Sequence, residues 1–441
     1  MTRSFAHALR VALILPLVMS CGSCAPRATV SRPAPPPTRT LRALPGVLST
    51  RTLTGEVHRV RIEDLPEPYA SESARQGPEL TNPPEGTQLA VPEGFAVQLF
   101  ARDVSKARWL AEAPDGTILV AQSREEKITW LLDDNGDGVA EAQGVFAEGD
   151  PLDIPFGMAF ATVNDETFFF LGNQDEVRRW PWRAGQRSLE GTGTRITELP
   201  GGGYRQHWTR NVVTNGERLF VSVGSRSNVG REDAPRATVQ VMNFDGSERR
   251  TWASGLRNPV GLAFHPTTGA LYANVNERDH LGDDLVPDFF TRVDEGAFYG
   301  WPYAYLRASL LDPRRMRNGR SEAPELAART RSPDVLYQAH SAALGLAFYD
   351  HDAFGARYRG GAFAAFRGSW NRSSGTGYKL VFLPFEDGRA LGHYEDFLTG
   401  FMIDPSVPTT WGRPVGVLAR SDGSLLFTEE AGGRVFRVVR P

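Results

Sequence analysis

The sequence has almost no cysteine. The chain of 441 residues contains two, Cys21 and Cys24, and both lie near its N-terminal end. Once Cys21 is lipidated, as argued below, no disulfide can form within the chain, so the folded part depends on its hydrophobic core. With 41% hydrophobic and 10% aromatic residues, the sequence has enough apolar material for a sizeable core.

Long hydrophobic runs and an excess of one charge are also missing. The apolar run Val11–Val18 is too short to span a bilayer as a helix. The formal net charge is -3, from 49 basic and 52 acidic residues, and no dense basic stripe is present. The nearly balanced charge and the lack of a basic stripe argue against a nucleic acid as a partner.

The N-terminus has the features of an export signal. Arg3 and Arg10 place positive charge before the apolar run, and Val18-Met19-Ser20-Cys21 resembles the bacterial lipobox, in which a small residue precedes a lipidated cysteine. We expect a lipoprotein signal peptide over residues 1–20, lipid on Cys21, and a protein exported to face the periplasm or cell exterior. The alternative is a plain secretory signal that is cleaved nearby.

Two segments of different composition follow. Residues 21–40 are rich in proline and lack hydrophobic periodicity, which predicts a disordered tether. Residues 41–88 are mixed, and we expect an extended strap that lies along the domain. Residues 89–441 form the main domain.

The main domain repeats one pattern. A short apolar run, a turn with Asp, Asn or Gly and an alternating strand together predict a β-hairpin. The copies cover residues 107–122, 156–172, 210–224, 258–275, 344–366 and 413–429. Their spacing of about 55–60 residues suits a four-stranded blade with its loops. We therefore predict an all-β, six-bladed β-propeller closed into one ring, with a solenoid as the main alternative. Helix signals are scarce, and we expect at most a short helix within an excursion over residues 305–331.

Two motifs place polar residues directly before predicted inner strands. His207 ends the glycine-rich stretch 202–207, and its side chain could act as a general base because histidine titrates near neutrality. Arg257 and Asn258 precede the next repeat, where a guanidinium suits an anionic or quinone ligand. Each has a structural alternative, a histidine that bonds loop carbonyls or an arginine that bridges blades. His340 precedes a further strand and could also line a pocket.

A third motif is an acidic loop. Glu277, Asp279, Asp283 and Asp284 lie within eight residues and would repel one another unless a cation or basic side chains neutralise them. Calcium prefers such oxygen ligands, whereas the alternative is a solvated acidic loop. A second acidic stretch, Asp133–Gly138, starts like an EF-hand loop but has Gly144 at the twelfth position, which favours a hairpin turn.

The motifs together resemble a known family. GLRNPVGLAFHP (255–266), NERD-x-LGDDL (276–285), YGWPY (299–303), GSWNR (368–372), GTGYKL (375–380), GRPVG (412–416) and SDGSL (421–425) occur in the order found in quinoprotein aldose, sorbosone and pyranose dehydrogenases. The resemblance covers about residues 88–441 and implies a six-bladed propeller that oxidises a sugar or related hydroxyl or aldehyde with pyrroloquinoline quinone and calcium. It also implies an external electron acceptor, a cytochrome or a quinone.

The resemblance also implies roles for individual residues. His207 would be the general base, and Arg257 and Asn258 would contact the cofactor, with Arg257 stabilising charge on the quinone oxygen. Lys379 and Arg413 would contact the cofactor's carboxylates. The loop of Glu277, Arg278, Asp279, Asp283 and Asp284 would hold calcium, largely through main-chain oxygens. We expect His207, Arg257, Lys379 and Arg413 to converge near the axis on one face.

The sequence departs from this family at two positions. Arg367 stands where histidine is expected, and Glu429-Glu430 stands where an aspartate pair is more usual. Two other functions remain open, a calcium-dependent lactonase on the same fold and a non-catalytic propeller that binds glycans or proteins.

The N-terminal motif makes a prediction about location. Replacing Cys21→Ala removes the only proposed lipid attachment site, so the protein should leave the membrane fraction for the soluble fraction. Fractionation of cells that express either form checks this. A Cys24→Ala variant serves as the control and should remain with membranes; retention of the Cys21 variant would contradict lipid attachment.

Overall fold

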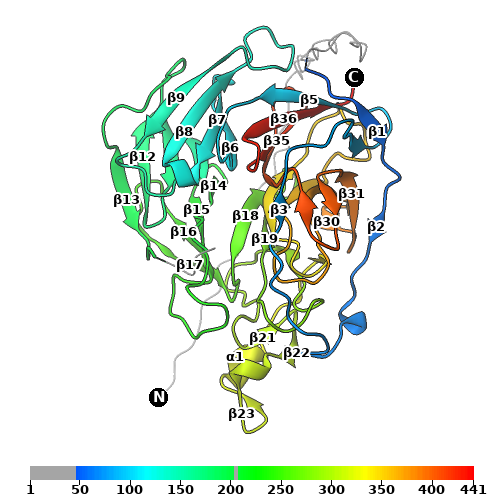
Figure 1. The fold of residues 1–441 in the computed structure, drawn as a ribbon. Helices are drawn as coiled ribbons and strands as arrows, with labels where there is room; N and C mark the ends of the chain where they lie inside the picture. Colours follow the sequence, from blue (N-terminus) through cyan, green and yellow to red (C-terminus); the bar gives the residue numbers. More distant parts are fainter. Residues whose placement is uncertain (1–45, 203–206) are drawn as a thin grey trace, which may run out of the picture. The chain divides into compact units, whose positions relative to one another are not determined.

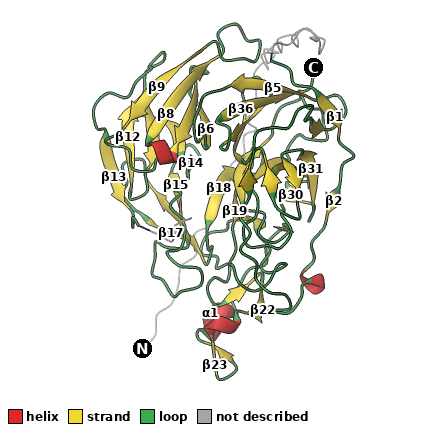
Figure 2. Ribbon diagram, in the orientation of Figure 1, coloured by secondary structure: helices red, strands yellow, loops and turns green. Residues whose placement is uncertain are grey.

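The computed structural model describes residues 46–202 and 207–441, which form six antiparallel blade sheets, five of four strands and one of five (Figures 1 and 2). Within these ranges no helix is long and apolar enough to cross a membrane. The signal peptide, Cys21, the tether and the loop residues 203–206 lie outside the described residues, as does the first part of the strap.

Each of the six sheets is one blade, and each predicted repeat forms its first two strands. The blades are β6 (Trp109–Glu112), β7 (Ile118–Gln122), β8 (Lys127–Leu132) and β9 (Ala142–Glu148); β10 (Met158–Val163), β11 (Glu166–Gly172), β12 (Glu176–Pro181) and β13 (Thr194–Glu198); β14 (Val212–Thr214), β15 (Leu219–Val223), β16 (Thr238–Met242) and β17 (Arg250–Ser254); β18 (Pro259–Phe264), β19 (Leu271–Val275), β20 (Phe289–Arg292) and β25 (Val335–Leu336); β26 (Ala343–Phe348), β27 (Ala362–Phe366), β28 (Lys379–Leu383) and β31 (Tyr394–Leu398); β34 (Pro414–Ala419), β35 (Leu425–Glu429), β36 (Arg434–Val439) and β5 (Ala96–Ala101).

The other elements are short. The excursion in blade 4 holds two small hairpins, one 3-10 turn and one α-helical turn, so the expected short helix is present. These and the remaining elements are β1 (Thr50–Thr52), β2 (Val57–His58), η2 (Ile62–Asp64), β3 (Glu79–Leu80), β4 (Leu89–Val91), η3 (Ser123–Glu125), β21 (Ala304–Tyr305), β22 (Arg307–Leu311), η4 (Pro313–Arg315), β23 (Met316–Arg317), β24 (Arg320–Ser321), α1 (Pro324–Ala327), β29 (Phe385–Glu386), β30 (Arg389–Ala390), β32 (Met402–Asp404) and β33 (Thr409–Thr410).

The six blades close into a ring. The innermost strands contact one another in the order β6, β10, β14, β18, β26, β34 and back to β6. The N-terminal strand β5 pairs antiparallel with β36, so the sixth blade contains both ends of the domain. The predicted six-bladed propeller is therefore confirmed.

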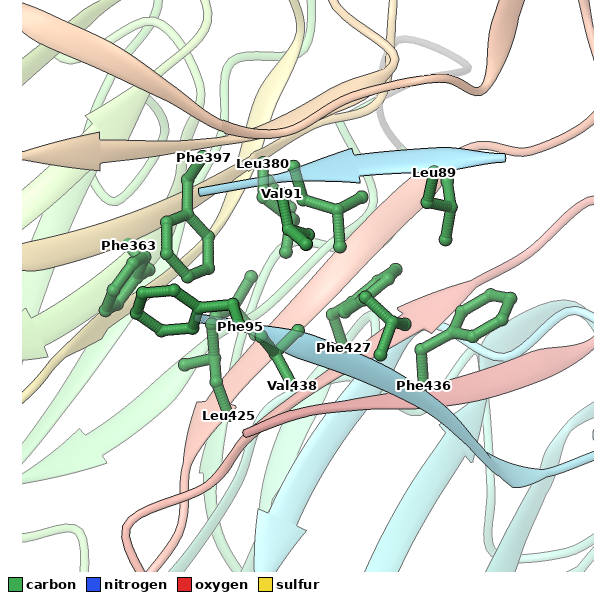
Figure 3. Packing of buried hydrophobic residues seen from close by; sticks show 14 of the residues in the cluster. Leu89, Val91, Phe95, Phe363, Leu380, Phe397, Leu425, Phe427, Phe436 and Val438 are labelled. Carbon is green, nitrogen blue, oxygen red and sulfur yellow. The ribbon is translucent and has the colours of Figure 1, made fainter. Parts of the chain in front are cut away.

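A hydrophobic cluster stabilises this closure (Figure 3). Phe95, just before β5, packs edge-on against Phe397 of blade 5, with ring centroids 5.2 Å apart. Leu89 and Val91 of β4 join the same cluster, together with Phe427 and Phe436 of blade 6. Burial of these side chains holds the N-terminal strands between blades 5 and 6.

The inner strands approach very closely at glycines. A Cβ added at Gly345 of β26 would lie 2.4 Å from the carbonyl oxygen of Val415, and one at Gly416 of β34 would lie 2.4 Å from that of Arg108. Both glycines also lie at shifts in strand register, between Ala343 and Leu346 and between Pro414 and Val417. A larger residue cannot fit at these positions without moving the neighbouring backbone.

The predicted strap crosses several blades. Strand β1 runs parallel to β4, β2 adds a fifth strand to blade 5, and β3 pairs with β33. Between β2 and β3, backbone N–H groups of Tyr69 and Gln76 donate to the carbonyl oxygens of Leu281 and Trp370, each over 2.8 Å. The strap is thus an ordered part of the domain.

The close approach of the inner strands predicts a stability effect. Replacing Gly416→Ala should lower the free energy of unfolding by about 1–3 kcal/mol, because the added methyl group overpacks the contact between blades 6 and 1. Thermal and urea unfolding measure the change. Gly77→Ala is the matched control, because no atom lies within 4 Å of its added Cβ; equal stability of the two variants would contradict the packing argument.

Candidate active site

A cavity of about 240 Å³ opens where the inner strands begin. Residues that precede inner strands line it, among them His207, Arg257 and His340. Residues that follow second strands line it from the other side, among them Arg124 and Arg367. The six-fold arrangement therefore gathers residues that lie far apart in the sequence.

His207 is positioned as a base. Its Nδ1 lies 3.1 Å from the carbonyl oxygen and 3.0 Å from Oγ of Ser225, and this Oγ donates to the carbonyl of Ser227. Because both groups can then only accept, the neutral ring carries its proton on Nδ1 and its lone pair on Nε2. Burial, followed by the charge of Arg257, lowers the pKa of His207 well below 6.5, so the ring is neutral near pH 7.

Arg257 lies at the cavity, but its donors are occupied by the protein. Nε and one terminal nitrogen donate to the carbonyl and Oδ1 of Asn228, at 3.1 and 2.8 Å. The other donors meet the carbonyls of Asn276 and Glu277 and Oδ2 of Asp279. The arginine therefore fixes the acidic loop and lowers the pKa of His207, and its guanidinium donates to protein atoms.

Several buried polar atoms on the cavity wall lack hydrogen-bond partners in the described part of the chain. They are Nε of Arg108, Oγ1 of Thr209, Oδ1 of Asn258 and Oε1 of Glu277. Leaving such atoms unpaired costs free energy in an isolated domain. The wall is therefore suited to a polar ligand.

The two departures from the family pattern form an ion pair. Nε of Arg367 donates to Oε1 of Glu430 over 2.7 Å, and Arg108 pairs with Oε2 of the same carboxylate. Arg413 lies behind them and donates to the carbonyl of Arg367 over 3.2 Å. Three guanidinium groups thus surround one carboxylate, which leaves an excess of positive charge.

The excess of positive charge around Glu430 affects the pKa values of the cluster of Arg108, Arg367, Arg413 and Glu430. Burial opposes ionisation of Glu430, but the charges of Arg108 and Arg367 outweigh it and lower the pKa to about 2. Burial and then the charge of Arg367 lower the pKa of Arg413 to about 9. The cluster, placed in a low-dielectric site, favours a bound anion.

The predicted metal loop does not bring its side chains together. Glu277 pairs with the fully buried Arg278, which also contacts Asp312 over 3.1 Å, and Asp279 pairs with Arg257. Asp283 accepts from the backbone of Ser373 and Asp284 pairs with Arg372 over 2.7 Å. Arg278, Asp283 and Asp284 do not line the cavity. The expectation that this loop holds calcium largely through main-chain oxygens stays a prediction.

Asp288 is a cavity residue that sequence reasoning missed. Its two carboxylate oxygens accept backbone N–H groups of Glu277 and Ala342, each over 2.7 Å. Burial raises its pKa to about 7, because these two hydrogen bonds only partly compensate for the lost hydration. The available signal was a single aspartate in the otherwise apolar stretch Leu285–Phe290.

Lys379 is separated from the other predicted residues. It begins β28, the third strand of blade 5, and its Nζ lies 2.5 Å from Oδ1 of Asp396. The strap residue His58 contacts the same carboxylate over 2.9 Å. Lys379 lines a different cavity, which strap residues also line, and the expected convergence holds for His207 and Arg257. Arg413 donates to the carbonyl of the lining residue Arg367.

The EF-hand-like stretch forms the turn between β8 and β9, as predicted. Side chains of Asp133, Asp137 and Glu141 lie within 4.8 Å of one another there. Backbone N–H groups of Asp137 and Gly138 donate to the Asp133 carboxylate, which is the pattern of a tight polar turn.

Comparisons with known proteins agree with this architecture. A family model described as TrAA12-like matches residues 89–288 and 315–441. An uncharacterized protein of Borreliella burgdorferi is 27% identical over 370 residues, which span 79% of this chain and 90% of the relative.

Solved structures share the fold. The calcium structure of a Trichoderma reesei protein of Carbohydrate-Active Enzymes Family AA12 is 18% identical, with 82% of this chain and 98% of that chain covered and a TM-score of 0.69. The holo form of the pyranose dehydrogenase PQQ domain from Coprinopsis cinerea is 19% identical, with 82% and 99% covered and a TM-score of 0.66.

The arginine cluster predicts a pH-dependent stability. Glu430→Gln should lower the free energy of unfolding at neutral pH by about 3 kcal/mol. This value is at the lower end of the range for breaking a buried ion pair, because Arg367 is partly exposed. The folded-state pKa lies below the ordinary 4.5, so the wild-type advantage is present above pH 4.5 and is lost as pH falls toward 2.

Urea unfolding of both proteins at neutral pH and at pH 3 measures this difference. Glu248→Gln, which removes a solvent-exposed partner of Arg218, is the control and should change little at either pH. A gap between wild type and Glu430→Gln that is as large at pH 3 as at neutral pH would show that the charge of Glu430 is not its cause.

Proposed function

The chain belongs to the TrAA12-like family, and on that premise we propose that it is a quinoprotein oxidoreductase that oxidises a sugar or a related hydroxyl or aldehyde compound. The observation that carries the proposal is the joint presence of a neutral, oriented histidine and an excess of guanidinium groups in one axial cavity. The pyranose dehydrogenase and AA12 structures with the same fold support the substrate class.

The cavity fits an anionic cofactor. Arg108 and Arg367 line it with only Glu430 to neutralise them, and Arg413 adds a third charge behind the wall. Such an environment suits the carboxylates of pyrroloquinoline quinone, which these arginines would hold together with Asn258. When bound, the quinone supplies the acceptor for the hydride of the substrate C–H bond, with a calcium ion to polarise it.

The acidic side of the same cavity suits a hard cation. Oε1 of Glu277 and Oδ1 of Asn258 are buried oxygen atoms without hydrogen-bond partners among the described residues, and calcium prefers oxygen ligands. Asp279 and Asp288 also line this side of the cavity. The two oxygen atoms of Glu277 and Asn258, in place of the side chains of Asp283 and Asp284, would contribute ligands to the ion.

His207 would act as the general base. Ser225 fixes the Nδ1–H tautomer, so Nε2 can accept the proton of a substrate hydroxyl without prior deprotonation of the ring. Arg257 would not touch the reacting atoms but would keep His207 neutral and the loop that carries Asp279 in place. The side chains of Val260, Leu344 and Trp370 give the wall an apolar part that limits water.

The lactonase alternative finds less support. That chemistry requires several carboxylates on one axial metal, whereas Glu277 and Asp279 each pair with a buried arginine. Among residues 46–202 and 207–441, three mutually close carboxylate or histidine side chains occur only at the β8–β9 turn and beneath the strap.

We also propose that the enzyme works outside the cytoplasm as a lipid-anchored protein. The N-terminal motif and Pro-rich tether support this location. An external electron acceptor, a cytochrome or a quinone, would complete the reaction cycle.

Reconstitution tests the function directly. Purified protein mixed with pyrroloquinoline quinone and calcium should reduce an artificial electron acceptor when sugars are supplied. Replacing His207→Ala should then lower kcat by about 10²–10⁴-fold, the contribution of a positioned general base, while the Kd of the quinone changes little. Steady-state rates and fluorescence titration with the quinone measure the two quantities.

A histidine remote from the cavity provides the control. His265 bonds to backbone N–H groups of Thr267 and Thr268 and does not line the cavity, so His265→Ala should keep near-normal turnover. If His207→Ala also keeps it under saturating quinone, the assignment of the base is wrong and His340 becomes the next candidate.

A further inference from the structure

Arg124 differs from the other arginines of the axial cavity. Arg108, Arg257 and Arg367 each pair with a carboxylate, whereas the Arg124 side chain forms no hydrogen bond or ion pair with any residue in 46–202 or 207–441. Arg124 is exposed and belongs to the η3 turn directly after β7. Among the described residues, the positive charge of Arg124 therefore has no carboxylate partner at the rim of the cavity.

The neighbouring carboxylate does not neutralise it. Glu125 accepts a hydrogen bond from Oγ of Ser105 over 3.3 Å. The nearest described aromatic partner of Arg124 is Trp208, whose ring centroid lies 5.6 Å from the guanidinium carbon. This contact holds the side chain in place without reducing its charge.

Trp208 places the charge of Arg124 close to the proposed base, His207. Trp208 directly follows His207 in the chain and is buried. The guanidinium group of Arg108 also packs on its ring, with 4.8 Å between guanidinium carbon and ring centroid. Two cations therefore share one ring beside the proposed base. Glu430 compensates the charge of Arg108, and an anion would be needed to compensate that of Arg124.

The buried arginines and the exposed Arg124 lie at different depths in the site, so we expect them to bind different ligands. Arg108 and Arg413 are held behind or within the wall, where a buried cofactor would lie, whereas Arg124 is at the solvent-exposed rim, where a substrate would enter. We propose that the substrate is an anionic sugar, an inference that rests on the proposed function. Arg124 binds its carboxylate or phosphate while the hydroxyl to be oxidised meets His207.

Matched sugars test the proposal. D-Galacturonate, D-galactose 6-phosphate and D-galactose are compared on the quinone- and calcium-loaded protein, by calorimetry for binding and by acceptor reduction for kcat/KM. At least one anionic sugar should bind more tightly than D-galactose, and its Kd should rise with ionic strength. Preference for the first or the second probe distinguishes a carboxylate from a phosphate.

In the variant Arg124→Gln, the preference for the anionic sugar over D-galactose should fall about tenfold in both Kd and kcat/KM. A change of this size corresponds to the loss of one charge-assisted hydrogen bond. Arg124→Lys should retain part of it. Arg250→Gln is the matched control, because Arg250 also packs on a tryptophan, Trp252, but lies on the outer strand β17.

The outcomes separate the inference from the proposed function. Equal binding of all three sugars, or an Arg124→Gln variant with unchanged preference, overturns the inference even if D-galactose is oxidised. Weakened quinone binding with unchanged sugar preference also overturns it, since Arg124 would then serve the cofactor. An Arg124-dependent preference for an anionic sugar supports it, and if no sugar is oxidised, the proposed dehydrogenase activity alone fails.

Discussion

The inner strands of neighbouring blades meet so closely that side chains cannot pass between them. At Gly345 and Gly416 the backbone of the next blade fills the space that a Cβ would need. At these two contacts no side chain can lie between the blades. The cavity that His207, Arg257 and Arg367 line opens where these closely packed inner strands begin.

The charge balance of the cavity depends on pairs that bridge blades. Arg108 precedes blade 1, Arg367 follows the second strand of blade 5 and Glu430 follows that of blade 6. One carboxylate thus joins three blades electrostatically at low dielectric. Because Arg367 and Glu430 contact each other, the two positions at which the sequence departs from the expected pattern belong to one ion pair.

The sequence predicted those features that follow from strand order alone. Hairpin periodicity gave the six blades, and the position directly before an inner strand placed His207, Arg257 and Asn258 at the axis. Lys379 begins a third strand, which lies farther from the axis, so the same reasoning does not reach it. The pairing of Arg257 with Asp279, the burial of Asp288 and the exposed charge of Arg124 depend on how loops from different blades fold over one another, which no local pattern encodes.

The strap is part of the site as well as a connection to the N-terminus. Its Tyr69 and Ser71 bond the backbone of Leu281 and Asp283, on the loop that carries Asp279, and Gln76 bonds the carbonyl of Trp370. Both loops line the cavity through Asp279 and Trp370. Since loop backbones without such partners open at low free-energy cost, the strap restricts the motion of two walls of the cavity. The segment that the sequence predicted as an extended strap along the domain therefore contributes to the preorganisation of the site.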